Sequence, residues 1–223
     1  MPARLKRYHG SEQIHFITFT CFHRLSLLEC APAKRTFEAA LERVRRAYRL
    51  CVYGYVVTPE HVHLLVSEPE RSNLAQAIKS LKQGVSRRLI GERDRFWQTR
   101  YYDHNVRSYE SFVGKLKYIH RNPVKCGLCA RPDDWEWSSF RHYATGVEGA
   151  VEIESEWTAR RRERAGVTPT VAAAPHSSQT GLEWATISVT GDHPNPTTNN
   201  QQLTPPLAPL CTFELQYSPY EGT

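Results

Sequence analysis

Along the first half of the chain, segments in which hydrophobic residues recur every second position alternate with segments in which they recur at helical spacing. Residues 14–22 alternate β-branched and aromatic side chains, which is typical of a strand with at least one buried face. Residues 32–50 follow, with Pro32 where a helix can begin and apolar residues spaced three and four apart. This spacing predicts an amphipathic helix.

Two short apolar stretches then meet at a turn. Residues 51–57 and 61–67 each have the composition of a strand, and Thr58-Pro59-Glu60 lies between them. Pro59 has no backbone N–H to donate, which keeps it out of strand pairing. Because the connection is so short, we expect the two strands to form a hairpin.

A second amphipathic helix is predicted after Ser72, whose side chain can cap the helix N-terminus. A fourth strand over residues 101–106 follows a polar segment. The resulting order, β-α-β-β-α-β, is that of a ferredoxin-like α+β sheet with both helices on one side. The apolar stripe of the second helix consists of Leu74, Ile78, Leu81, Val85 and Leu89.

A third helix is predicted over residues 108–122, with Pro123 as its stop. At about 100° per residue its side chains divide into an apolar stripe and a neighbouring polar stripe. Tyr118 and Asn122 are one turn apart and face the same way. The apolar stripe contains Phe112, Leu116 and Ile119, and the polar stripe contains Ser111, Lys115, Tyr118 and Asn122.

Charge and composition divide the 223 residues into parts. Residues 1–150 contain 25 lysines and arginines against 15 acidic residues, whereas residues 151–223 contain 4 against 8. A basic surface suits a partner made of phosphate, and the alternative is a solvated surface without function. Eight of the fourteen prolines lie after Gly166. We expect one domain over residues 1–150, a short basic helix or linker over 151–166, and a Pro/Thr/Asn/Gln-rich, disordered tail over 167–223.

The six cysteines show no disulfide framework, and the N-terminus does not resemble a signal peptide. We therefore expect a reduced, cytoplasmic protein. Cys126 and Cys129 have C-x-x-C spacing, but no second pair completes a zinc knuckle, and we interpret the spacing as incidental. No apolar run reaches the ~18 residues of a transmembrane span, so no membrane partner is expected.

His61 and His63 are the first candidates for chemistry. Residues two apart on a strand point to the same side, so the two imidazoles form half of a metal site that needs a third ligand. The alternative is a pair of strand histidines with hydrogen-bonded ring nitrogens. The amide oxygen of Asn122 suits Mg²⁺ or Mn²⁺, and the phenol of Tyr118 beside a metal is a plausible nucleophile. The alternatives are a rim tyrosine and an asparagine that satisfies local backbone groups.

Two separated motifs also occur in the order known from one family. His61-Val62-His63 after a proline-containing turn, and the stretch from Tyr118 to Leu128 with Asn122-Pro123, resemble the single-tyrosine HUH transposases. Within them the chain is most similar to the REP-associated tyrosine transposases. The resemblance extends over about residues 16–143 and includes Phe96-Trp97-Gln98, Tyr102-Asp103-His104 and Trp137-Ser138-Ser139-Phe140-Arg141.

The resemblance implies roles for four residues. His61, His63 and Asn122 match the ligands of a divalent metal ion, Mg²⁺ or Mn²⁺, and Tyr118 matches the nucleophile. The fold it implies is a ferredoxin-like sheet with an added C-terminal helix that carries this tyrosine. The activity it implies is metal-dependent DNA transposition, in which single-stranded DNA is cleaved through a 5′-phosphotyrosine and then rejoined.

Substrate and partners follow from the same resemblance. It implies hairpin DNA of the REP type, a nucleoid location in the cytoplasm, and either a monomer or a homodimer. Trp97, Tyr101 and Tyr102 either stack on unpaired bases or pack in the protein. A domesticated hairpin-binding protein without turnover is the main alternative, and a metal-dependent hydrolase is a third. Basic residues expected to contact DNA are Arg4, Lys6, Arg7, Lys79, Lys82, Arg87, Arg88, Lys115 and Arg121.

Overall fold

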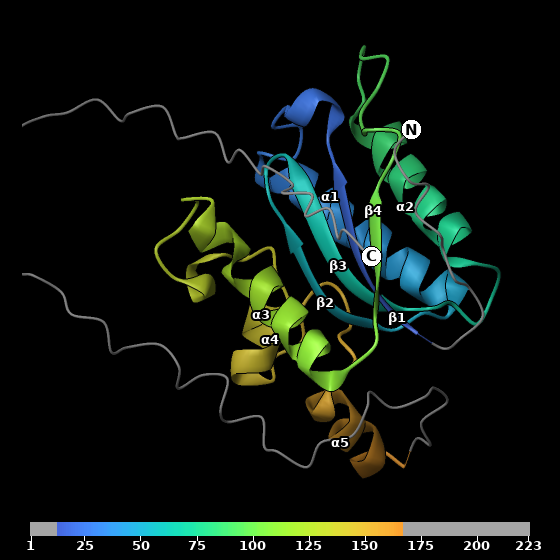
Figure 1. Cartoon of the computed structure of the whole chain (residues 1–223), viewed down its shortest axis with the longest axis vertical. Coiled ribbons are helices and arrows are strands. Elements are labelled where there is room, and N and C mark those ends of the chain that lie inside the picture. The colour runs from blue at the N-terminus through green and yellow to red at the C-terminus, as the bar shows by residue number, and fades with distance from the viewer. Residues whose placement is uncertain (1–12, 167–223) are drawn as a thin grey trace, which may run out of the picture.

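A computed structural model describes residues 13–166, which are built around a four-stranded antiparallel sheet (Figure 1). The strand order across the sheet is β2-β3-β1-β4, so β2 and β4 are the edges. The expectations for residues 1–12 and for the tail 167–223 lie outside the described residues. The strands are β1 (Ile14–Thr20), β2 (Val52–Val57), β3 (His61–Ser67) and β4 (Tyr102–Val106).

Helices connect and follow these strands. The described chain begins β1-α1-β2-β3-α2-β4, which is the predicted succession, and α3 comes directly after β4. An α+β protein with a four-stranded antiparallel sheet is therefore confirmed. The helices are α1 (Ala31–Tyr48), α2 (Leu74–Leu89), α3 (Tyr109–Lys125), α4 (Phe140–Thr145) and α5 (Glu156–Arg164), with short 3-10 turns at Phe22–Arg24 and Pro132–Asp134.

The sheet has a core on each face. On one face α1 and α2 pack over apolar residues such as Ile17 and Leu64 in the larger of two core clusters. On the other face α3 packs over a smaller cluster that includes Phe16 and Leu65. Neighbouring residues of one strand thus belong to different cores, because side chains alternate across a sheet.

Gly54 sets how closely α3 approaches β2. A β-carbon added at Gly54 would lie 2.6 Å from Cδ1 of Leu116, which is too close for two carbon atoms without a shift. The pairing of β2 with β3 is also irregular between Val52 and Gly54, as in a β-bulge. The missing side chain therefore lets the helix contact the sheet backbone.

The predicted end of α3 was wrong. Pro123 lies inside the helix, which continues to Lys125 and ends where Gly127 adopts a φ of +68°. Leu128 N–H donates to Pro123 O and Gly127 N–H to Val124 O, so the last carbonyls are satisfied beyond the proline. Pro123 is buried, and its burial offsets the helical hydrogen bond that a proline cannot donate.

The predicted cap of α2 was also displaced by one residue. Ser72 has a φ of +69° and precedes the cap. The N-cap is Asn73, whose side chain accepts a hydrogen bond from Gln76 N–H. Both residue types suit the position, and the backbone geometry selects the second.

Residues after α3 return to the edge of β2. Ser139 N–H donates to Tyr55 O, and Glu154 N–H donates to Val52 O. Val151 and Ile153 join the core beneath α1 and α2. The segment expected to be a short basic helix or linker contains α5. Across residues 13–166, the helices lack the length and apolar character needed to cross a membrane.

Candidate active site

Three predicted ligands converge between β3 and α3. His61 Nε2 lies 3.2 Å from Asn122 Oδ1, and Asn122 Nδ2 lies 3.2 Å from His63 Nε2. The three side chains are almost fully buried, with exposed fractions of 4%, 4% and 0%. The sheet alternation and the helix periodicity therefore bring these polar groups, far apart in sequence, to one point.

Thr58, in the turn before β3, favours a proton on one ring nitrogen of His61. Its hydroxyl donates to His61 O and accepts from His61 N–H, and it also lies 3.0 Å from His61 Nδ1. With the hydroxyl proton directed to His61 O, and with Glu60 Oε1 3.4 Å from Nδ1, both neighbours favour a proton on Nδ1. The lone pair of His61 is then on Nε2, which points at Asn122.

This arrangement fits a cation. In that tautomer the lone pair of His61 Nε2 faces the oxygen of Asn122 at 3.2 Å, and two acceptors in contact repel unless a positive charge joins them. Two imidazole nitrogens and an amide oxygen are ligands for divalent ions. Within residues 13–166 no cluster of three His, Cys, Asp or Glu side chains is suited to a metal ion. The candidate site differs from such a cluster because its third member, Asn122, offers an amide oxygen.

Neighbouring groups keep both imidazoles ready to bind. Thr18 Oγ1 lies 2.7 Å from His63 Nδ1 and orients its ring. Burial, with His61 and Lys115 nearby, holds the pKa of His63 well below its usual value, so the ring stays neutral. Glu60 Oε1 is 3.4 Å from His61 Nδ1, and this contact lowers the pKa of the Glu60 carboxyl. The site therefore has a charged carboxylate behind one ligand.

Tyr118 lies beside the histidines, one turn before Asn122 on α3. Its ring is 5.1 Å from that of His63 and 5.9 Å from that of Phe16, edge to face in both contacts. Lys125 Nζ lies 5.3 Å from the Tyr118 ring centroid. The tyrosine is half-buried, so its ring is held by the sheet while part of its surface remains accessible.

The helix that carries Tyr118 and Asn122 is itself anchored through His120. His120 Nε2 is 2.9 Å from Ser139 Oγ, and Ser139 Oγ accepts from Tyr55 N–H on β2. Burial lowers the pKa of His120 to about 3, so the imidazole is neutral and acts as a fixed hydrogen-bonding group. The contact fixes the orientation of α3 about its own axis relative to the sheet.

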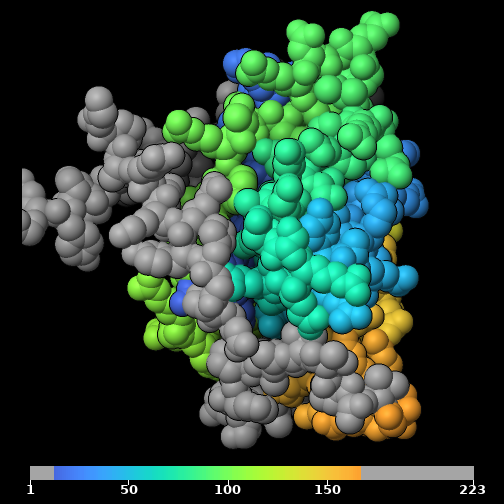
Figure 2. Space-filling model, turned by 90° about the vertical axis from the view of Figure 1, so that its right-hand side faces the viewer, coloured from blue at the N-terminus to red at the C-terminus, as the bar shows by residue number. Residues whose placement is uncertain are grey.

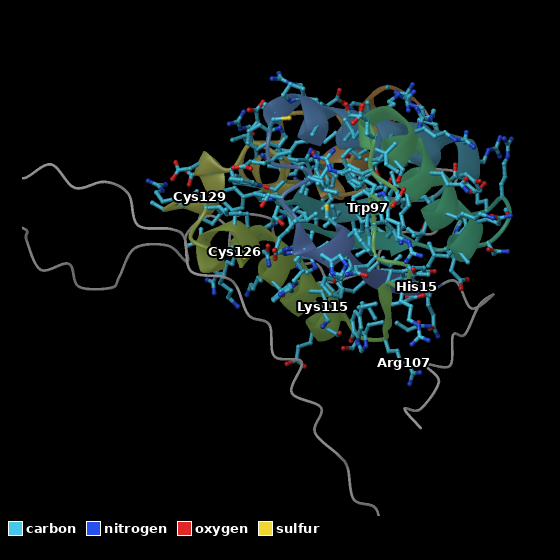
Figure 3. The ribbon with its side chains drawn as sticks, turned by 90° about the horizontal axis from the view of Figure 1, so that it is seen from above. His15, Trp97, Arg107, Lys115, Cys126 and Cys129 are labelled. Carbon is cyan, nitrogen blue, oxygen red and sulfur yellow. The ribbon has the colours of Figure 1, made fainter. Side chains whose placement is uncertain are left out.

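Those basic residues expected to bind DNA that the structure describes lie on two sides of the sheet. Lys115 and Arg121 are on α3; Figure 3 shows Lys115 and Cys126 along this helix, with Arg107 near its start. The cations of α2 lie across the sheet, on the side of the larger core. Arg4, Lys6 and Arg7 lie outside the described residues. The α2 group consists of Lys79, Lys82, Arg87 and Arg88.

The aromatic candidates separate in the same way. Trp97 is 7% exposed and packs on Phe19 and Phe37, which favours the packing alternative for this residue. Tyr102 is 39% exposed on β4 and remains available to a base. It lies on the same face as His104, with the two rings 6.2 Å apart and nearly parallel.

Several contributing residues were missed from the sequence. Thr18 shares a face with Phe16 in the strand pattern, but its partner on β3 depends on pairing that local sequence does not show. His120 lies between Tyr118 and Asn122 on α3 and is distinguished only by its packing. Cys126, interpreted as incidental, has its Sγ 3.9 Å from Asn122 Oδ1. Thr58 could have been found from the sequence, because it opens the three-residue turn that leads to His61.

Comparison with known proteins gives a consistent set of similarities. Residues 10–122 match the family described as "Transposase IS200 like". The chain is 32% identical over 117 residues to a Haemophilus influenzae protein named "Putative REP-associated tyrosine transposase", which covers 47% of this chain and 66% of the relative, just under two thirds. It is 27% identical over 147 residues to an Escherichia coli K12 REP-associated tyrosine transposase, which covers 65% of this chain and 87% of the relative.

A solved structure supports the fold. It is that of a REP-associated tyrosine transposase bound to a REP hairpin, and it covers 79% of this chain and 99% of its own. The TM-score is 0.58 at 22% sequence identity. At that identity the likeness concerns the fold alone.

Proposed function

Because the chain belongs to the IS200-like transposase family, we propose that it cleaves and rejoins single-stranded DNA at hairpin sites, with Tyr118 as the nucleophile. The observation that carries the proposal is the convergence of His61 and His63 with Asn122, with the Tyr118 ring packed against His63. Under this proposal the family's nucleophile and ligand roles fall on residues that meet in space.

Three residues would hold a divalent ion, Mg²⁺ or Mn²⁺. These are His61 and His63 through Nε2 and Asn122 through Oδ1. When bound there, the ion supplies a positive charge that stabilises the charge developing on the phosphoryl oxygens. Thr58 and Glu60 keep the proton of His61 on Nδ1, and Thr18 orients His63.

The reaction proceeds in two transfers. The phenolic oxygen of Tyr118 attacks the scissile phosphorus, the P–O3′ bond breaks, and the DNA is left as a 5′-phosphotyrosine with a free 3′-OH. A 3′-OH then attacks the same phosphorus and releases the tyrosine. One phosphodiester is exchanged for another, so rejoining requires no nucleotide triphosphate.

The partner proposed from the relatives is DNA folded as a REP-type hairpin. Lys115 and Arg121 lie on the helix of the nucleophile and would contact phosphates next to the cleavage point. In the same proposal the sheet and its two covering helices form a ferredoxin-like unit, and α3 is the added helix that carries the catalytic tyrosine. Either one copy of the chain or two form the working enzyme.

A single gel tests this function. Labelled hairpin DNA of the REP type is incubated with wild type and with Tyr118→Phe, with Mn²⁺ or with chelator, and resolved under denaturing conditions. We expect a metal-dependent covalent adduct only with wild type. An adduct that persists in Tyr118→Phe contradicts the assignment of the nucleophile.

The two alternatives give different bands on the same gel. A domesticated binding protein retards the hairpin on a native gel and forms no adduct with or without chelator. A metal-dependent hydrolase yields a nicked strand that is free of protein. Wild-type adduct formation therefore separates the proposed strand transferase from both.

A further inference from the structure

Lys125, in the last turn of α3, has no role in the chemistry described so far. The helix includes it because the chain stays helical through Pro123. Lys125 follows Tyr118 by seven residues, which is about two turns of an α-helix, so the two side chains leave α3 on the same face. The continuation of α3 beyond the proline therefore brings a cation to the face of the nucleophile.

The ammonium group of Lys125 lies against the nucleophile itself. Its Nζ is 5.3 Å from the centroid of the Tyr118 ring, which is within the range of a cation–π contact. Within residues 13–166 it forms no salt bridge with a carboxylate, and the Lys125 side chain is exposed to solvent. A lysine has a flexible stem, so an ammonium group with no carboxylate to hold it can move onto an anion that forms beside the ring.

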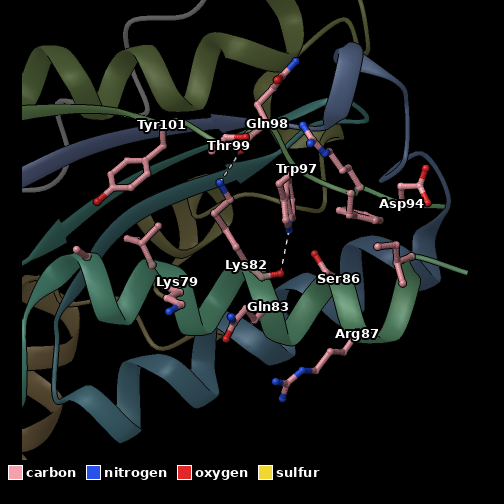
Figure 4. A pocket seen from close by; sticks show the side chains of 15 residues that line it. Lys79, Lys82, Gln83, Ser86, Arg87, Asp94, Trp97, Gln98, Thr99 and Tyr101 are labelled. Carbon is pink, nitrogen blue, oxygen red and sulfur yellow. Dashed lines mark hydrogen bonds between the residues drawn. The ribbon is translucent and has the colours of Figure 1, made fainter. Parts of the chain in front are cut away.

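Lysines elsewhere at the sheet are held in other ways. Lys82 donates from Nζ to the backbone oxygen of Gln98 inside the pocket of Figure 4, on the side of the molecule where α2 lies beside α1 (Figure 2). Lys115 lies over another ring, with its Nζ 4.8 Å from the centroid of Phe16. Neither of these contacts is with the nucleophile. Lys125 is therefore our candidate for contact with a group bonded to the nucleophile.

The position of Lys125 also has a purely structural explanation. A cation in the last turn of a helix interacts favourably with the helix dipole, and Lys125 is the basic residue of that turn. This interaction stabilises α3 whether or not Tyr118 carries a phosphate. A binding role depends on the phosphate, so the two explanations can be separated by changing both groups.

We propose that Lys125 binds the phosphoryl oxygens of the 5′-phosphotyrosine and holds this intermediate in place between cleavage and rejoining. The proposal rests on the proposed function, in which Oη of Tyr118 is bonded to the phosphorus of the DNA strand. Hydrogen bonds between an ammonium group and phosphoryl oxygens join two charged partners, so they are stronger than the contact with the neutral ring that they replace. A phosphate held in this way keeps its orientation for attack by the 3′-OH.

A double-mutant cycle between Tyr118 and Lys125 tests this contact without DNA or metal. Phosphotyrosine is introduced at position 118 of the full chain during translation. Urea unfolding in chelator is then measured for the chains with tyrosine or phosphotyrosine, each with Lys125 retained and with Lys125→Ala. The coupling is the difference between the two shifts in urea midpoint that phosphorylation causes.

We expect phosphorylation to lower the urea midpoint by about 0.5 M more in Lys125→Ala than in the chain that retains Lys125, because the variant lacks the charge-assisted hydrogen bond. Lys125→Arg should retain the coupling. Sulfotyrosine at position 118, with a single negative charge like the phosphodiester, should give a coupling of the same sign. Lys117 is the matched control, since it is exposed on α3 and adjacent helical residues do not face each other. Lys117→Ala should show no coupling.

A coupling at Lys125 no larger than that at Lys117 would overturn the proposal and leave only the helix dipole. Adduct formation on hairpin DNA of the REP type is measured in parallel. Lys125→Ala should lower its maximal rate about tenfold with little change in the DNA concentration at half-maximal rate, and a maximal rate equal to that of wild type would also overturn the proposal. If wild type forms no adduct while the coupling is present, the proposed function fails and Lys125 remains a phosphate-binding residue. If the adduct forms and the coupling is absent, the proposal for Lys125 alone fails.

Discussion

The two faces of the sheet differ in what they bury. The face under α1 and α2 carries the larger apolar cluster, in which Leu64 and Ile17 are fully enclosed. The face under α3 buries fewer apolar side chains and encloses His61, His63 and Asn122. Burial of polar groups costs free energy unless they are paired. Apolar burial on the α1 and α2 face therefore has to offset the cost of burying polar groups on the α3 face.

Strand β3 belongs to both faces. Val62 and Leu64 face the larger core, and His61 and His63, one residue away, face α3. Substitutions at neighbouring positions should therefore separate catalysis from stability.

The largest expected effect is on the α3 face. His63→Ala removes one imidazole and should lower the rate of adduct formation at least about 100-fold, because changes to groups that only orient a ligand already cost 10–100-fold. The rate is measured on labelled hairpin DNA over a range of Mn²⁺ concentrations. A rate within a few-fold of wild type at all concentrations would remove His63 from the site.

On the opposite face, Leu64→Ala should leave the chemistry intact and reduce stability. Deleting a fully buried leucine side chain typically costs 2–5 kcal/mol in unfolding free energy. Urea unfolding measures the loss, and adduct formation is compared per folded molecule at low temperature. A rate per folded molecule as low as that of His63→Ala would mean that the two faces are not separable.

Substitution of Gly54 tests how closely α3 has to approach β2. Gly54→Ala places a methyl group 2.6 Å from Leu116 Cδ1 and should cost about 1–3 kcal/mol while displacing α3 and slowing the adduct. Gly114 on α3 is the control, since an added β-carbon there meets nothing within 4 Å. Gly114→Ala should stabilise the helix by about 0.5–1 kcal/mol. Equal urea midpoints for the two variants would contradict the close approach.

The smallest effect is expected at Glu38, on the buried side of α1. Burial raises the pKa of Glu38 above its ordinary 4.5, so the folded chain binds this proton more tightly than the unfolded chain does. The stability from this group is therefore present at low pH and is lost as pH rises from 4.5 through the folded pKa. Tyr55 OH donates to its carboxylate, and an amide can accept that bond.

Glu38→Gln should therefore raise the unfolding free energy at pH 8 by about 1 kcal/mol, and by less at pH 4.5. Urea unfolding at both pH values measures the difference. The same gain at both would show that the charge of Glu38 is not its cause.

Much of the fold could be predicted because local patterns agree with it. The alternation in residues 61–67 matches β3 residue by residue, and the predicted order of strands and helices is observed. The end of α3 could not be predicted, since Pro123 is buried inside the helix and the hydrogen bonds that close the helix are made by the residues after it. The same holds for α4, a six-residue helix whose start is tied to β2 through Ser139.

The sequence could indicate which residues share a face at the candidate site, but not the distances and hydrogen bonds between them. Two periodicities place His61 with His63 and Tyr118 with Asn122, yet neither gives the distance between strand and helix. The tautomer of His61 depends on three contacts of one hydroxyl group, that of Thr58. These contacts depend on the backbone geometry of the turn, which cannot be predicted from the residue types alone.

The turn at Thr58 has a consequence for how the chain folds. Thr58 N–H donates to His61 O, which closes the β2-β3 hairpin and determines which residues of the strands lie opposite each other. A slip of one residue would send the imidazoles into the larger apolar core and turn Val62 and Leu64 toward α3. Such misaligned chains would be less stable and would not bring the imidazoles to Asn122, so the short turn and the hydrophobic pattern of β3 together determine the register.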